Sequence, residues 1–290
     1  MSEYVIVTDS SGDMNAEMVQ QLGVEVLPLS LTVRGTTFHN YPDDREMDPK
    51  EFYRMLRAGE PATTAAVNVH DYTSFLTPVL ESGKDVLILA FSSGLSATYQ
   101  SSCIAAEELR AKFPGRTVEV VDTLCASLGQ GLIVFLAAQR KLRGESLAEV
   151  RDWVLENRLH LCHWFTVDDL HFLKRGGRVS AATAVVGSML HIKPVMHVDN
   201  EGHLINMAKA RGRAASLTAL VDHMEATAIE PATTPVFISH GDCLEDAQKV
   251  ADDIRRRFGT QDIRINNIGP VIGAHAGPGC VALFFVGTER

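Results

Sequence analysis

The sequence predicts an α/β protein with a parallel sheet in its N-terminal half and a mixed sheet in its C-terminal half. Through the first half, short β-branched runs alternate with helical patterns, as in a parallel sheet covered by helices. Beyond residue 160 the extended segments come closer together, and two of them flank Asp199-Asn-Glu-Gly202 as in an antiparallel hairpin. We therefore expect two α/β domains, residues 1–160 and 161–290.

In the N-terminal half, apolar periodicity and capping signals define the elements. Asp48-Pro49 reads as an N-cap followed by a first-turn proline, and Gly59 as the stop after that helix. The expected strands are 4–8, 24–29, 85–91 and 117–121, and the expected helices are 14–22, 51–56, 95–113 and 128–142, with a further helix that starts near residue 69.

In the C-terminal half, a connecting helix over residues 145–159 precedes a series of strands. The only basic run, Arg255-Arg256-Arg257, reads as the C-terminal end of a surface helix, where cations are favoured by the helix dipole. The expected strands are 161–167, 193–198, 204–208, 235–239, 262–265 and 280–286.

The composition excludes several classes of partner. With a formal net charge of −9 and no stripe of Lys and Arg, the chain lacks what a nucleic-acid partner requires. Its five cysteines form no C-x-x-C pair, which favours a reducing compartment. The first residues read as a strand and not as a signal sequence, and no apolar stretch approaches the roughly 20 residues of a membrane span. We expect a cytoplasmic protein that is not integral to a membrane.

The segment from Ile268 to Gly279 is the most informative part of the chain. It places His275 among the glycines 269, 273, 277 and 279 and the prolines 270 and 278. Glycine lets a ligand approach the main chain and proline stiffens the segment, so we expect a loop. A tight turn would explain the glycines and prolines but not a titratable imidazole. We interpret this loop as a ligand site, with a plain turn as the alternative.

A serine-rich turn follows the most hydrophobic strand. Ser92, Ser93 and Ser96 lie around Gly94, where the strand gives way to a long helix. In a parallel sheet such turns lie at the carboxyl edge, and the free N–H groups at the helix start attract anions. The two readings are a ligand site and a serine-rich helix cap.

Two further polar segments have the same two readings. Thr8 to Asp13 follows the first strand, and Ser11 or Asp13 is a candidate helix cap. Thr63 and Thr64 precede the helix that starts near residue 69, where their hydroxyls serve either as caps or as ligand donors.

Three cations surround a diglycine after two carboxylates in the segment 168–178. Lys174, Arg175 and Arg178 read either as the capped end of a helix or as a docking surface. We expect no metal site, because a strand over 161–167 would point residues 160 and 163, two of the nearby histidines, to opposite sides. The G-x-S-x-G, dinucleotide and P-loop motifs are absent or incomplete, so no cofactor is indicated.

Several blocks of the sequence, taken in order, resemble the DegV family of bacterial fatty-acid-binding proteins. The resemblance extends over almost the whole chain. The blocks are Thr8-Asp-Ser10, Ser92-Ser-Gly-Leu-Ser-Ala-Thr-Tyr99, Val121-Asp-Thr123, Asp168-Asp-Leu170 through Gly176-Gly-Arg178, Ile192-Lys-Pro194 and Ile268 through Gly279.

The resemblance implies a lipid-binding protein of two α/β domains, with a long-chain fatty acid between them and no catalytic activity of its own. The positions that match the family's carboxylate contacts are Thr64, Ser93 and His275, supported by Thr63, Ser92, Gly94, Ser96, Gly273 and Gly277. It also implies that the protein is the binding subunit of a fatty acid kinase, whose catalytic subunit makes an acyl phosphate for phospholipid synthesis. Lys174, Arg175 and Arg178 are then candidate contacts for that partner.

The chain departs from the family in two places. The usual T-S-Q-P-S is here Thr64-Ala-Ala-Val-Asn68, which leaves the choice between Thr63 and Thr64 open. The usual Thr-His-Thr is Ala274-His275-Ala276, which removes two hydroxyls.

Physical reasoning agrees with a carrier of an acyl chain. About fifteen buried methylenes contribute on the order of 12 kcal/mol of binding free energy, which exceeds the lower estimates of the free-energy cost of association.

Two alternative functions stay open. One is a hydrolase or acyltransferase that uses Ser92, Ser93 or Ser96, with His275 as base and Asp9 as the orienting group. The other is a carrier of a different apolar ligand.

Overall fold

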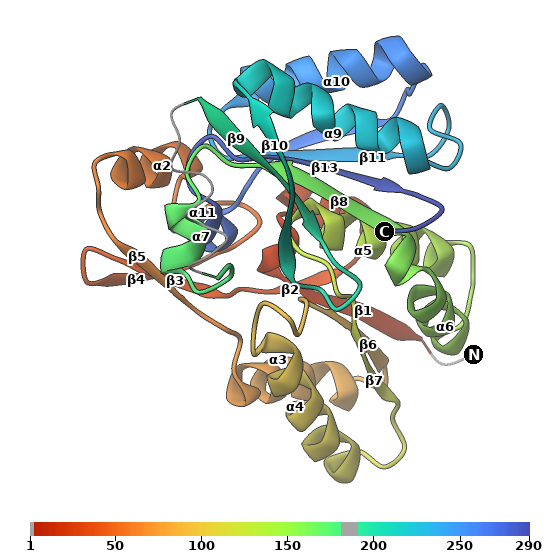
Figure 1. Ribbon diagram of the computed structural model, residues 1–290. Helices are drawn as coiled ribbons and strands as arrows, with labels where there is room; N and C mark the ends of the chain where they lie inside the picture. The colour runs from red at the N-terminus through yellow and green to blue at the C-terminus, as the bar shows by residue number, and fades with distance from the viewer. Residues whose placement is uncertain (1–2, 181–190) are drawn as a thin grey trace.

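A computed structural model of the protein describes residues 3–180 and 191–290. Its layers are visible in Figure 1, where α9 (Arg213–Thr227) and α10 (Leu244–Phe258) cover one sheet, and α3 (Val69–Glu81) and α4 (Thr98–Lys112) cover another. Helix α5 (Leu128–Leu142) lies between the two sheets. The N-terminal sheet is parallel and the C-terminal sheet is mixed, so the predicted α/β class is confirmed.

The parallel sheet is built from the βα units that the sequence predicts. Its central strand β6 is buried on both faces, which explains the continuous apolar run of that strand. In order across the sheet the strands are β2 (Glu25–Leu27), β1 (Tyr4–Asp9), β6 (Asp85–Ala90) and β7 (Val118–Asp122). The other elements of this half are η1 (Ser10–Gly12), α1 (Ala16–Leu22), α2 (Pro49–Arg57), α6 (Leu147–Asn157) and η2 (Arg158–His160).

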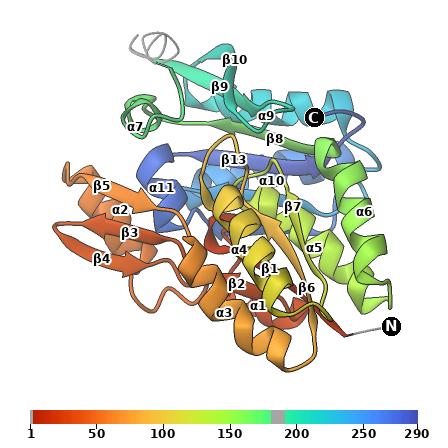
Figure 2. The same cartoon turned by 90° about the horizontal axis from the view of Figure 1, so that it is seen from below.

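The mixed sheet contains the predicted hairpin. β10 pairs with β9 in antiparallel register, and among the described strands of this sheet only β11 and β12 are parallel neighbours. The order across the sheet is β10 (Leu204–Arg211), β9 (Ile192–Val198), β8 (Leu161–Thr166), β13 (Val281–Val286), β11 (Val236–His240) and β12 (Ile263–Asn267). Two short helices, α7 (His171–Arg175) and α11 (Pro270–Ala276), lie near its edge. Figure 2 shows α11 beside the small sheet described next.

A third sheet was not predicted. β4 (Thr36–His39), β3 (Ser30–Val33) and β5 (Ala62–Ala65) form an antiparallel sheet. Thr63 and Thr64 therefore lie in a strand, and the helix-cap reading is wrong because Asn68 caps α3 by accepting the N–H of Asp71 at 3.0 Å. The cap reading of Ser11 and Asp13 is also wrong, since Asn15 caps α1.

The predicted loop around His275 is instead a short helix. α11 begins with Pro270 in its first turn and ends at Gly277, whose φ of 77° is the left-handed conformation that glycine tolerates. Proline at the first position costs a helix nothing because that N–H has no partner in any case. The dense glycines and prolines thus mark the two ends of a helix, and the imidazole is carried on a helical scaffold.

Glycines bring α5 close to both halves of the molecule. Its residues from Leu128 to Phe135 are buried. A Cβ at Gly129 would lie 2.1 Å from Nε2 of His163, and one at Gly131 would lie 2.7 Å from the carbonyl oxygen of Gly12. The Gly-x-Gly pair therefore allows tight packing of α5 between the sheets.

A buried polar network joins the two sheets beside α5. Asp13 accepts hydrogen bonds from Oγ of Ser127 at 2.5 Å and from the N–H of Gly269, at the start of α11, at 2.9 Å. Ser127 Oγ also lies 2.9 Å from Oγ of Ser239 in β11. Ser127 has a φ of 53°, an unfavourable conformation for serine, so these bonds hold a strained residue at the start of α5.

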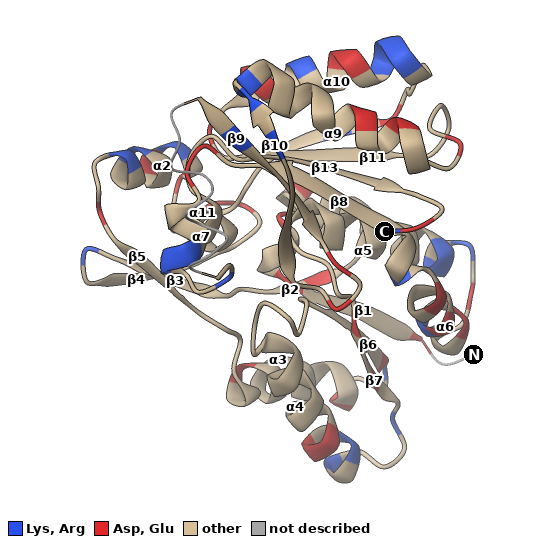
Figure 3. Cartoon of the chain, in the orientation of Figure 1, with Lys and Arg blue, Asp and Glu red and all other residues tan. Residues whose placement is uncertain are grey.

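Charged residues lie mainly on the outer helices and loops. Figure 3 shows Lys and Arg mixed with Asp and Glu on α10 and α6. The basic run at the end of α10 is paired with carboxylates: Arg255 lies 3.0 Å from Asp252, and Arg257 lies 2.6 Å from Asp222. The surface-helix interpretation of this run is therefore confirmed. Among the described residues, no helix is both long and apolar enough to cross a membrane.

Candidate functional site

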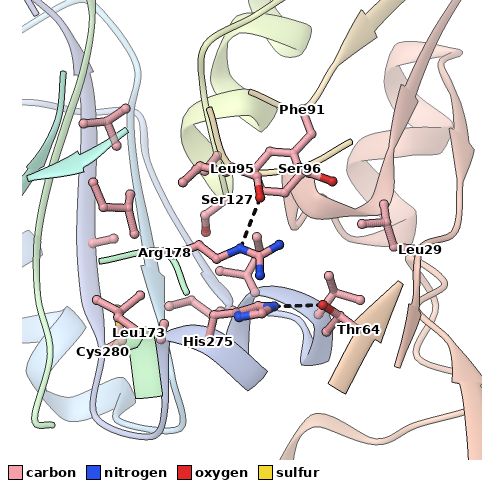
Figure 4. Close-up of a pocket in the computed structure, with 18 of the residues that line it drawn as sticks. Leu29, Thr64, Phe91, Leu95, Ser96, Ser127, Leu173, Arg178, His275 and Cys280 are labelled. Carbon is pink, nitrogen blue, oxygen red and sulfur yellow. Dashed lines mark hydrogen bonds between the residues drawn. The ribbon is translucent and has the colours of Figure 1, made fainter. Parts of the chain in front are cut away.

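An apolar cavity of about 220 Å³ lies where segments of both halves meet. Its wall contains β5, the serine-rich turn, the start of α5, the inner face of the mixed sheet, α7 and α11. Figure 4 shows the cavity, which is mostly apolar but has a polar cluster of Thr64, Arg178 and His275. The apolar lining includes Leu29, Phe91, Leu95, Phe165, Leu173, Val198, Leu204, Ile268, Val271, Ile272, Ala282 and Phe284.

Thr64 and His275 are brought together from distant parts of the chain. Oγ1 of Thr64 lies 2.8 Å from Nε2 of His275. Because side chains alternate along a strand, Thr63 points away from the cavity and is exposed. Thr64, and not Thr63, is therefore the threonine of this cluster.

His275 is a neutral imidazole in the folded protein. Burial, and then the nearby guanidinium groups of Arg178 and Arg175, lower the pKa of His275 to about 4. Its Nδ1 is buried and has no hydrogen-bond partner among the described residues. A Cβ at Gly176 would lie 2.1 Å from that Nδ1, so glycine is needed there for the ring to occupy its place.

Arg178 lines the cavity. Its Nε donates to the carbonyl oxygen of Leu95 at 3.1 Å, and its Nη1 donates to the carbonyl oxygen of Gly176 at 2.5 Å. The side chain is half-buried, and Figure 4 shows the guanidinium next to the imidazole of His275. Arg178, grouped in the sequence with Lys174 and Arg175 as a candidate partner contact, thus lies in the cavity wall, where two backbone carbonyls hold its side chain.

The three serines of the strand-to-helix turn have different surroundings. Ser96 lines the cavity. Ser92 is buried and donates to the carbonyl oxygen of Gly202 at 2.9 Å. Ser93 is exposed, does not line the cavity, and its backbone N–H donates to Asp122 at 3.2 Å. The structure therefore brings Ser96, but not Ser93, to the cavity wall.

The glycines near the site have packing roles. Gly94 lies under the turn of the β9–β10 hairpin, where a Cβ would lie 2.9 Å from the carbonyl oxygen of Gly202. At Gly273 a Cβ would lie 2.5 Å from the hydroxyl of Tyr53, so this glycine lets α11 approach α2. Gly277 packs against the ring of Phe172 in the same way, with a Cβ placed 2.6 Å from it.

The Ser-His-Asp arrangement that a hydrolase would need is not formed. Asp9 accepts the N–H groups of Phe91 at 2.9 Å and of Ser11 at 3.2 Å, whereas Nδ1 of His275 has no hydrogen-bond partner among the described residues. The His275 Nε2 atom is paired with Thr64 and not with a serine. Within residues 3–180 and 191–290, no group of three or more His, Cys, Asp or Glu side chains is placed to hold a metal ion.

Comparison with known proteins identifies the family. The chain matches the model of the DegV family, described as an uncharacterised protein family, over residues 3–288. The chain belongs to the DegV family. A DegV domain-containing protein of Clostridium perfringens is 45% identical over 290 residues, which are 100% of this chain and 99% of that protein. A Streptococcus pyogenes relative of the same description is 32% identical over 286 residues, covering 99% of each chain.

Solved structures of DegV proteins share this fold. The Thermus thermophilus structure, described by its fatty acid binding, is 30% identical with a TM-score of 0.87, and the match covers 99% of this chain and 100% of that one. DegV of Bacillus subtilis, described as a fatty acid binding protein, is 26% identical with a TM-score of 0.85, again over 99% and 100%. These DegV neighbours bind fatty acids.

Some residues of the DegV cavity were missed by sequence reasoning. Ser127 and His163 both line it, although neither belongs to a block that resembles the family. The signal for Ser127 was its place one residue before a helix whose central residues, Leu132 to Ala138, are all apolar. For His163 the signal was an imidazole within a mostly apolar strand, and the face on which it lies could be decided only from the strand's pairing.

Proposed function

We propose that this protein binds a long-chain fatty acid in the cavity, with the carboxylate beside Thr64, His275 and Arg178. The observation that carries the proposal is this polar cluster in the wall of an otherwise apolar cavity. The relatives from Thermus thermophilus and Bacillus subtilis, described by their fatty acid binding, support the ligand class.

The polar cluster supplies what a desolvated carboxylate needs. A carboxylate out of water is costly unless hydrogen-bonded or paired. The guanidinium of Arg178 offers donors and a positive charge, and the hydroxyl of Thr64 offers a further donor. The sequence prediction included Ser93; because Ser96 is the serine that lines the cavity, Ser96 is the additional hydroxyl in this proposal.

The apolar wall supplies the affinity for the chain. Leucine, isoleucine, valine and phenylalanine side chains from both halves surround it. Each methylene removed from water contributes about 0.8 kcal/mol, so a long chain offsets the cost of association. We propose that residues 1–160 and 161–290 are the two domains and that the acid lies between them.

The head-group proposal is tested by competition between matched ligands. A fluorescent fatty acid is displaced from the protein by a saturated acid, or by the alcohol or methyl ester of the same chain length. We expect the acid to displace the probe at a concentration at least about tenfold lower than either neutral compound, because only the acid pairs with the charged group. Equal displacement by all three would contradict a carboxylate site and favour a carrier of another apolar ligand.

A carrier role without catalysis is part of the proposal. In it the protein presents the acid to the catalytic subunit of a fatty acid kinase, which forms the acyl phosphate in the cytoplasm. The described cysteines are all free, which supports a reducing compartment. Lys174 and Arg175 are exposed on α7, whose C-terminal glycine Gly176 packs against His275, so they lie near the proposed head-group site.

We expect charge reversal on α7 to weaken the kinase interaction. In the variant Lys174→Glu/Arg175→Glu, acyl phosphate formation by added kinase should fall about tenfold, because opposite charges at an interface rim steer association. Because Arg175 lies near His275, retention of the acid is measured in parallel, and acyl phosphate formation is compared per bound acid. Lys112→Glu, an exposed cation at the end of α4, is the matched control. Normal acyl phosphate formation by the α7 variant would overturn this assignment.

A further inference from the structure

The cavity follows the inner face of two paired strands and stops at a defined pair of residues. Ala282 is opposite Phe165, and Phe284 is opposite His163, in the register of β13 with β8. All four line the cavity. The next pair on the same face, Leu161 and Val286, does not line it. Along these strands, the cavity therefore ends at His163 and Phe284.

The other end of this wall leads to the polar cluster. Cys280 precedes β13, lines the cavity and follows α11, the helix that carries His275. Strand residues advance about 3.4 Å each, so the wall from Cys280 to Phe284 is about 14 Å long. An acyl chain whose carboxylate lies at His275 and which follows this wall points its methyl end at His163.

The imidazole of His163 is fixed in place from three sides. Its Nδ1 lies 2.8 Å from the carbonyl oxygen of Leu161, and its Nε2 lies 3.4 Å from the N–H of Ala126. The ring of Phe284 meets it edge to face, with centroids 5.2 Å apart. Gly129 of α5 lies so close that a Cβ there would be 2.1 Å from Nε2.

Because of these contacts, the imidazole of His163 forms part of the cavity wall and does not donate a hydrogen bond to a ligand. The carbonyl oxygen of Leu161 can only accept, so Nδ1 carries the proton, and Nε2 faces the N–H of Ala126 as an acceptor. Burial keeps the pKa of His163 well below its usual value, so the ring is neutral. Both ring nitrogens have backbone partners, and the remaining ring surface contacts the cavity.

We infer that His163, backed by Gly129 and Phe284, is a specificity-determining residue that sets the longest acyl chain this protein accepts. The inference rests on the proposed fatty-acid function and on the carboxylate lying at His275. The space that an imidazole fills beside Gly129 is the space into which a longer chain would extend.

The test measures dissociation constants for saturated straight-chain acids of increasing length. In the unchanged protein, affinity should rise about fourfold with each added methylene and then stop rising at a limiting length. In His163→Ala the rise should continue for about two further methylenes, so that the first acids beyond the limit bind about tenfold or more tightly than they bind the unchanged protein. Phe284→Ala, which leaves the histidine hydrogen bonds in place, should move the limit in the same direction.

Two variants make the test specific. Gly129→Ala added to His163→Ala puts a methyl group where the imidazole was, 2.7 Å from Cδ1 of Phe284, so that the methyl group and the displaced ring should move the limit back towards shorter chains. Cys162→Ala changes the adjacent residue on the opposite face of β8 and should leave the limit unchanged. If His163→Ala and Phe284→Ala bind acids with the same limiting length as the unchanged protein, the inference is overturned. If no acid binds the unchanged protein, the proposed function fails and the inference fails with it.

Discussion

His275→Ala is expected to lower the affinity for a long-chain fatty acid by about 10- to 100-fold, because a hydrogen bond to a charged group contributes about 1.5–3 kcal/mol. Nε2 of the imidazole lies 2.8 Å from Oγ1 of Thr64, so removal of the imidazole also leaves the Thr64 hydroxyl without the partner that orients it. The dissociation constant, measured by displacement of a fluorescent acid, gives the result. Because α11 keeps its ends and its packing on α2, the fold should be retained, which circular dichroism and thermal unfolding check.

Two neighbouring threonines provide the matched control. Thr64→Ala should weaken binding in the same direction as His275→Ala, while Thr63→Ala should leave it within about twofold, because Thr63 is exposed on the other face of β5. A double-mutant cycle of Thr64 and His275 should be non-additive, since their side chains act as a pair. Unchanged affinity in both His275→Ala and Thr64→Ala would show that the carboxylate binds elsewhere.

Asp13→Asn is expected to remove a pH-dependent part of the unfolding free energy. Between pH 4 and pH 7, the difference in unfolding free energy between the unchanged protein and the variant should change by an amount on the order of 4 kcal/mol. Burial raises the pKa of Asp13 from 3.8 to about 7, opposed by the hydrogen bonds from Ser127 and Gly269, and each unit of pKa shift corresponds to about 1.4 kcal/mol. The side chain is fully buried, so solvent does not screen this effect. Asparagine keeps an oxygen for the N–H of Gly269 and an amide for Ser127, but has no charge.

The sign follows from the direction of the shift. The pKa of Asp13 is higher in the folded than in the unfolded protein, so its stabilising contribution is fully present below about pH 4 and is lost as pH rises through about 7. The difference in unfolding free energy between the unchanged protein and Asp13→Asn should therefore move in favour of the variant from pH 4 to pH 7 and level off above. Urea unfolding across this range measures it. A difference that is constant with pH would show that Asp13 ionises at an ordinary pKa.

Local signals in the sequence were sufficient for the regular elements. The apolar run of β6, the Asp48-Pro49 start of α2 and the β9–β10 hairpin each follow from residues that are adjacent in the chain. The third sheet, made of β4, β3 and β5, escaped prediction because its strands are four residues long and because β5 pairs with β3 across more than twenty residues of chain. Short antiparallel strands of this kind carry little periodicity.

Site residues could be predicted where the residue type was unusual for its sequence context. They could not be predicted where their role depends on the direction in which the side chain points. His275 stood out as an imidazole among glycines, and Thr64 followed from the resemblance. The inward direction of Arg178 depends on the carbonyl oxygens of Leu95 and Gly176, and no local pattern reveals those contacts. The same holds for His163, whose role at the cavity end depends on the register of β8 with β13.

The central claim is that the cavity holds a long-chain fatty acid, and solvent extraction of the purified protein tests it most directly. The extract is analysed by mass spectrometry and normalised to protein. We expect a near-stoichiometric amount of long-chain acid from the unchanged protein and from Thr63→Ala, and markedly less from His275→Ala. An extract without fatty acid, from protein that also fails to take up added acid, would contradict the claim.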